Sequence, residues 1–110
     1  MRRGAALLAL VGLAACAPVP PDRTGVAFRP DAGGLAVPET GRRVDFGRAP
    51  AGVVAPLTRE LGPFDPLPLA TCPDAITQRL RWGDLELTFT QERFVGWRQG
   101  AERAGQVCGG

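Results

Sequence analysis

The alternation of apolar and polar side chains between Arg79 and Arg98 constrains the fold of this 110-residue chain more than any other feature. Its apolar members before the turn at residues 91–93 are Leu80, Trp82, Leu85, Leu87 and Phe89. This period of two is typical of strands with one face packed and one face in water. Gly83-Asp84 interrupts it as a two-residue hairpin would, and residues 94–97 form a third apolar run. The sequence therefore predicts a three-stranded antiparallel meander.

Other strands are expected on either side of the meander. Residues 35–37 and 43–46 are short strand-like runs, and the turn-rich segment 38–41 between them indicates a hairpin. Val26-Ala27-Phe28 has the composition of a brief strand, and Gln106-Val107 would add an edge to the sheet.

A single amphipathic helix is expected between Pro50 and Gly62. Proline suits a first helical turn because its missing N–H has no intrahelical partner there, and glycine followed by proline is a typical stop signal. The residues that share one face of this helix are Val53, Val54, Leu57 and Leu61. Pro56 removes a backbone hydrogen bond, so either the helix kinks there or only a loose turn precedes Leu57.

These elements predict one α+β domain over residues 35–110. In this domain one amphipathic helix packs on a small antiparallel sheet of three to five strands. The proline-rich loop at residues 63–75 is expected to cover the core. A chain of this length has room for one small domain.

The first sixteen residues carry the pattern of an export signal. Arg2-Arg3 supplies a positive start, residues 5–13 supply an apolar run too short to span a bilayer, and the run ends in Leu13-Ala14-Ala15-Cys16. These four residues resemble the lipobox of bacterial lipoproteins. The resemblance implies a diacylglycerol on the Cys16 sulfur and removal of residues 1–15 as a signal peptide. The alternative is an ordinary buried helix that ends in cysteine.

Residues 16–34 would then form a lipid-anchored, flexible tether. The stretch is rich in proline and glycine without a sustained apolar period, so it cannot bury enough surface to offset its ordering entropy. Position 17 is alanine, and in the lipoproteins that this chain resembles an aspartate there commonly signals retention at the inner membrane. The resemblance therefore implies attachment to the outer membrane of the cell envelope, facing the periplasm.

The charge of the mature chain argues against nucleic acid as a partner. Removing Arg2 and Arg3 from the thirteen basic residues leaves eleven, against eleven acidic residues. Binding to phosphate backbones needs a surplus of positive charge on one face. The expected partners are the membrane, through the anchor, and an envelope protein.

Cys72 and Cys108 remain as an even pair once Cys16 carries lipid. An exported protein favours a disulfide between them. Closing a loop of about 37 residues stabilises the fold by about 3.8 kcal/mol in the chain-entropy model. The alternatives are a metal site and a reactive thiol. Two cysteines without histidine are too few ligands for structural zinc, and there is no Cys-x-x-Cys spacing for redox exchange.

The composition offers few residues that could act in catalysis. The chain has no histidine and no serine, which excludes Ser-His nucleophiles and the H-E-x-x-H metal motif. Nucleotide-binding glycine motifs are also missing, so no cofactor is expected. The acids weighed for paired-carboxylate hydrolysis are Asp45, Asp84, Glu86 and Glu92. Each is expected in a solvated or salt-bridged role. Glu86 alternates with core residues and should therefore point to water.

The two tryptophans suggest where a partner could bind. Trp82 keeps step with Leu80 and is expected in the core, whereas the parity of Trp97 is ambiguous beside two other apolar residues. If Trp97 and Arg98 lie on an exposed face, they are the first candidates for contact with a partner protein.

Between Phe46 and Trp97 the motifs L-G-P, W-G-D-L-x-L-x-F and R-F-x-G-W follow one another. This pattern resembles a group of small secreted lipoproteins of alpha-proteobacterial type without an established activity. Some of these carry the name aspartate-semialdehyde dehydrogenase, although the true enzyme needs a nucleotide-binding βαβ unit and a histidine base. The chain is also similar to small outer-membrane assembly lipoproteins of the BamE type.

The resemblance implies a non-catalytic envelope lipoprotein that binds a protein or has a structural role. A secreted inhibitor or ligand-binding module is the second hypothesis, and an enzyme is the third.

Overall fold

The computed structural model describes residues 26–109. Cys16, the rest of the lipobox, the predicted signal peptide and most of the predicted tether lie outside these residues. The elements in chain order are β1 (Arg29–Asp31), β2 (Gly34–Val37), β3 (Arg42–Asp45), α1 (Pro50–Leu61), β4 (Asp65–Pro66), β5 (Gln78–Trp82), β6 (Leu85–Phe89), β7 (Phe94–Gln99) and β8 (Glu102–Gly105).

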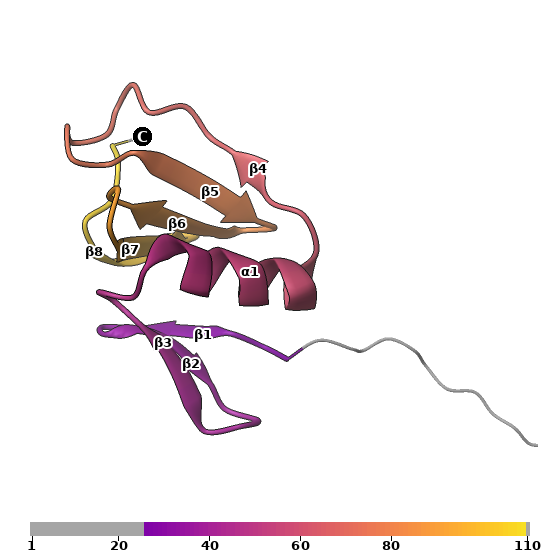
Figure 1. Ribbon diagram of the computed structural model, residues 1–110. Coiled ribbons are helices and arrows are strands. Elements are labelled where there is room, and N and C mark those ends of the chain that lie inside the picture. Colours follow the sequence, from indigo (N-terminus) through magenta and orange to yellow (C-terminus); the bar gives the residue numbers. More distant parts are fainter. Residues whose placement is uncertain (1–25, 110) are drawn as a thin grey trace, which may run out of the picture.

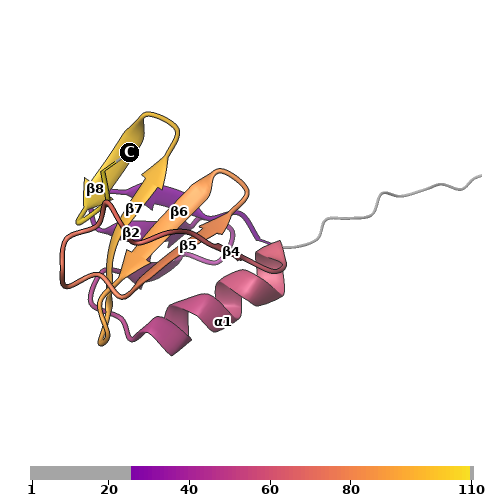
Figure 2. The ribbon, with the colours of Figure 1, turned by 90° about the horizontal axis from the view of Figure 1, so that it is seen from above.

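The fold class is α+β. Among the described residues one helix accompanies two antiparallel sheets, of order β1-β2-β3 and β4-β5-β6-β7-β8. Figure 1 shows the three-stranded sheet on one side of the molecule and the five-stranded sheet on the other. Seen from above, the five-stranded sheet overlies the smaller one, and α1 lies along the side of the pair (Figure 2). The helix thus closes one side of the space between two sheets.

The predicted meander is confirmed as β5-β6-β7. Leu87 is paired with Leu80 on one side and with Trp97 on the other, which continues the apolar row across three strands. The turn at Gly83-Asp84 joins β5 to β6, with Gly83 at φ +61°, a conformation that glycine adopts without steric cost. Trp82 is buried in the core, as predicted.

The core draws on both sheets and the helix, because each presents an apolar face to the same interior. Its buried members are Leu35, Val44, Val53, Leu57, Leu80, Trp82, Leu85, Leu87, Phe89, Phe94 and Trp97. Phe94 marks the place where the sheets meet. Its carbonyl accepts from the Gly47 N–H at 2.8 Å, and its own N–H donates to the Arg48 carbonyl at 2.8 Å. The chain that follows β3 is thereby fixed against the start of β7.

The predicted first hairpin is confirmed as β2-β3, but it gains a third strand from the predicted tether. Arg29, Pro30 and Asp31 pair with β2, so the folded part begins before Leu35. The Trp97 indole explains why, because its N–H donates to the Asp31 carbonyl at 2.7 Å and so ties β1 to the larger sheet. At the other end, the edge strand is β8 rather than Gln106-Val107, where the edge was predicted.

The helix is continuous from Pro50 to Leu61, with Pro56 inside it. It ends at Gly62, whose N–H donates to the Thr58 carbonyl at 2.9 Å. Val53 and Leu57 are fully buried, as predicted. Leu61 was predicted on the same face but is 42% exposed, because it lies in the last turn, where the helix has passed the edge of the core.

The prediction that the meander keeps one face in water is wrong for β6. All five residues of β6 are buried, including Glu86 and Thr88, whereas Arg81 on β5 is exposed. The loop after β4 and the C-terminal segment cover the outer face, and Figure 2 shows the loop running across the strands. Arg79 donates to the Pro68 carbonyl at 3.0 Å, and the Thr88 hydroxyl donates to the Gln106 carbonyl.

Glu86 therefore does not point to water. It is 8% exposed, and one of its carboxylate oxygens lies 2.7 Å from the Arg79 guanidinium Nε. A buried charge requires a partner of opposite sign, and Arg79 across the β5-β6 pair supplies it.

The disulfide between Cys72 and Cys108 is present, with a Cα–Cα distance of 4.1 Å. Next to it, the Gly109 N–H donates to the Thr71 carbonyl at 2.9 Å. The disulfide therefore joins the loop between β4 and β5 to the C-terminal segment. It holds both segments on the outer face of the five-stranded sheet.

Candidate functional site

The predicted contact pair does not form an exposed site. Trp97 is 4% exposed and packs in the core, so the condition on which it was a candidate is not met. Arg98 is half-buried, and its guanidinium donates to the Cys108 carbonyl. Both side chains hold parts of the fold together: Trp97 joins the two sheets, and Arg98 fixes the C-terminal segment beside the disulfide.

The four acids weighed for catalysis lie apart. Asp45 accepts from the Arg43 Nε at 2.7 Å, Asp84 accepts from the Gln99 amide at 3.0 Å, and Glu86 belongs to the buried pair. Glu92 is exposed at the turn before β7. Among residues 26–109 no three or more cysteine or acidic side chains gather as metal ligands would.

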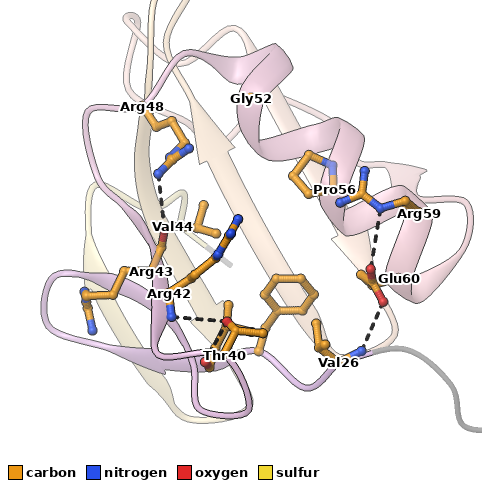
Figure 3. Close-up of a pocket in the computed structure, with 12 residues that line it drawn as sticks. Val26, Thr40, Arg42, Arg43, Val44, Arg48, Gly52, Pro56, Arg59 and Glu60 are labelled. Carbon is orange, nitrogen blue, oxygen red and sulfur yellow. Dashed lines mark hydrogen bonds and ion pairs between the residues drawn. The ribbon is translucent and has the colours of Figure 1, made fainter.

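A cleft of about 690 Å³ opens between α1 and the three-stranded sheet. Its lining residues are Val26, Phe28, Val37, Thr40, Arg42, Arg43, Val44, Arg48, Gly52, Pro56, Arg59 and Glu60. Figure 3 shows Arg42 and Val44 of β3 on one side of it and Pro56 and Arg59 of the helix on the other. Four of the lining residues are arginines and one is acidic, so the cleft is positively charged.

One of these arginines is already neutralised. The Arg43 guanidinium donates to both carboxylate oxygens of Asp31, at 2.9 and 2.8 Å, and to Asp45 at 2.7 Å. The hydrogen bonds from Arg43 are the main reason that the pKa of Asp31 is lowered to about 2, and the Gly33 N–H adds to the effect. The two carboxylates in turn raise the pKa of Arg43 above its ordinary value.

Arg42 and Arg48 have no carboxylate partner among residues 26–109. Arg48 donates to the Arg43 carbonyl at 3.2 Å, and its side chain lies along Gly52 of the helix. The Arg42 guanidinium makes no hydrogen bond or ion pair with any described residue. In Figure 3 it extends from β3 toward the helix, into the open space, whereas Arg43 points away.

The helix contributes Arg59 and Glu60 at the other side of the cleft. Arg59 has a side chain that is 68% exposed, with its Nε 3.5 Å from the Glu60 carboxylate. Glu60 also accepts from the Val26 N–H at 3.1 Å. Because Glu60 is the one acidic residue among the lining residues, against four arginines, it offsets only part of the positive charge around it.

Part of the lining is apolar. Val37 and Val44 are 6% and 7% exposed, and Phe28 and Pro56 line the same cleft. The site thus combines apolar side chains with guanidinium groups. Such an arrangement can bind an anion that carries an apolar part.

Sequence reasoning missed this cleft, although a signal for it exists. All the charged residues of the lining fall within residues 42–60. Arg59 follows Gly52 by seven positions and Pro56 by three, so the three share one helical face. What the sequence alone could not provide is the pairing of that face with β3.

Comparison with family models, with curated proteins and with solved structures found no match for this chain. Within residues 26–109 no helix has the length and apolar character needed to cross a bilayer.

Proposed function

We propose that this chain is a lipid-anchored lipoprotein of the cell envelope, and that its domain acts by binding rather than by catalysis. Cys16 carries the lipid, the mature chain starts there, and the domain faces the periplasm from the outer membrane. The partner is a protein of the envelope.

The observation that carries this proposal is the pairing of the other two cysteines. With Cys72 and Cys108 bonded to each other, Cys16 is the one cysteine of the three left for another role. Disulfides persist in oxidising compartments outside the cytosol, which is also where the lipobox pattern would send the chain.

The composition and the geometry support a binding role. A chain without histidine or serine lacks the residues most used for proton transfer and for nucleophilic attack. Its acids are paired or separated, and the cleft described above is lined by apolar side chains and arginines. These features suit binding rather than catalysis.

Metabolic labelling with palmitate tests the anchor. The full chain is expressed in a bacterium with an outer membrane, beside a Cys16→Ser variant and a Cys72→Ser/Cys108→Ser control that keeps the lipobox. We expect label in the wild type and in the control, recovered with outer membranes, and none in Cys16→Ser. Equal labelling of the Cys16→Ser chain would contradict the proposal.

Affinity capture from detergent-solubilised membranes tests the binding role. We expect a stoichiometric complex with an envelope protein, and the Cys16→Ser chain should lose it because it leaves the membrane. Recovery of a soluble enzyme in place of an envelope protein would support an inhibitor instead.

A further inference from the structure

The path of the chain places the arginine cleft near the membrane. Val26 is the first residue of the described domain, and it lines the cleft. Its N–H is held by Glu60 of the helix at 3.1 Å. Residues 17–25, which join it to Cys16, span at most about 35 Å even when fully extended. A lipid on Cys16 therefore keeps the opening of this cleft within that distance of the bilayer surface.

The charges at the opening match what the surface of an anionic membrane offers. Arg42 and Arg48 have no carboxylate among the described residues, and Arg59 is largely exposed. Guanidinium groups bind phosphate oxygens through paired N–H donors. Arg43 cannot take part, because Asp31 and Asp45 occupy its donors.

The apolar part of the lining favours a lipid over a free anion. Phe28, Val37, Val44 and Pro56 line the same cleft as the guanidinium groups. Inorganic phosphate has no apolar part to place there, whereas a phospholipid has a glycerol backbone and acyl chains next to its phosphate. Tethering also raises the effective concentration of the headgroups at the cleft, since anchor and ligand share one surface.

We propose that the cleft between α1 and the three-stranded sheet binds the phosphate of anionic phospholipid headgroups in the membrane that carries the anchor. Arg42 and Arg48 bind the phosphate, and Arg59 adds to the attraction from the helix. The domain then lies with this face on the bilayer, and its opposite face is left for the protein partner. This inference rests on the proposed function, because the lipid at Cys16 brings the cleft to the surface.

Arginine modification by phenylglyoxal, mapped by mass spectrometry, tests the cleft directly. The lipidated full chain is reconstituted in nanodiscs of phosphatidylcholine alone or with phosphatidylglycerol. We expect phosphatidylglycerol to slow modification of Arg42 and Arg48 by about tenfold, the factor expected for a charge-assisted hydrogen bond. Arg103, exposed on β8 and away from the cleft, is the internal reference and should react at the same rate in both discs.

Matched variants give the second readout. Phosphatidylglycerol should also protect Arg59 in the wild type. In an Arg42→Gln/Arg48→Gln chain this protection should be lost, and in Arg103→Gln it should persist. Neither variant removes an ion pair seen in the structure, and the first loses only the exposed hydrogen bond from Arg48 to the Arg43 carbonyl, so both should unfold close to the wild-type temperature. Raising the salt concentration should weaken the protection in the wild type, because exposed charges are screened.

Three results would overturn this inference. The first is equal modification of Arg42 and Arg48 in both discs. The second is protection of Arg103 to the same degree, which would show diffuse attraction to the surface. The third is equal protection in phosphatidylcholine discs with inorganic phosphate, which would assign the cleft to a free anion. The intact mass of the same sample separates these failures from failure of the anchor, since it reports directly whether Cys16 carries lipid.

Discussion

The two sheets of this domain differ in how their arginines are used. On the five-stranded sheet, Arg79 is buried, paired with Glu86 and covered by a loop held by the disulfide. At the three-stranded sheet, Arg42 of β3 and Arg48 after it line a cleft without carboxylate partners among the described residues. The first arrangement closes a surface and the second leaves one open. The difference separates residues that hold the fold together from residues available to a ligand.

The largest loss of stability should come from breaking the buried ion pair between Arg79 and Glu86. Replacing Glu86 with leucine leaves the Arg79 charge buried without its carboxylate, which should lower the free energy of unfolding by about 3–5 kcal/mol. The Arg79→Met/Glu86→Leu chain should recover most of this loss, because it buries no charge. Urea denaturation followed by tryptophan fluorescence measures both.

The exposed pair in the same sheet is the matched control. Asp65 and Arg81 lie 3.6 Å apart with side chains 72% and 46% exposed. Asp65→Asn should change the unfolding free energy by less than about 0.5 kcal/mol. A loss in Glu86→Leu no larger than this would show that the outer face is not closed.

The disulfide should contribute the next largest share. Cys108→Ser frees the loop and the C-terminal segment, and we expect a loss of about 2–5 kcal/mol on thermal or urea unfolding. Reduction of the wild-type protein should give a loss of similar size. Cys16→Ser is the control and should leave unfolding of the domain unchanged. A Cys108→Ser domain as stable as the wild type would show that the disulfide does not stabilise the loop and the C-terminal segment on the sheet.

The smallest effect on stability should come from the exposed ion pair between Asp31 and Arg43 on the three-stranded sheet. The pKa of Asp31 is lowered to about 2 from 3.8 by Arg43. A lowered carboxyl pKa contributes stability above the ordinary pKa, and that contribution is lost as the pH falls from about 4 toward 2. NMR titration should give a pKa of about 2 for the Asp31 carboxyl, and Arg43→Gln should raise that pKa toward 3.8. An unchanged pKa in the variant would mean that Arg43 is not the cause.

Local patterns predicted much of the fold. The alternation around β6, the turn at Gly83-Asp84 and the helix stop at Gly62 each depend on neighbouring residues, and the structure has all three. The pairing of Cys72 with Cys108 followed from counting cysteines in a chain predicted to be exported.

Contacts between distant residues could not be predicted in the same way. The buried state of Glu86 depends on a loop that covers the sheet from outside, and alternation alone cannot show such a layer. Trp97 is buried because a strand from the predicted tether returns to its indole. The arginine cleft needs β3 and α1 at a distance that no local pattern fixes. The missed features are therefore those made where separate segments meet.

Intact-mass spectrometry of the native chain from purified membranes tests the lipid anchor and the disulfide in one experiment. We expect a chain that begins at Cys16, carries a lipid on that residue and contains one disulfide, visible as a gain of two mass units on reduction. A chain that begins at its initiator methionine, without lipid and with free thiols at residues 72 and 108, would contradict this expectation.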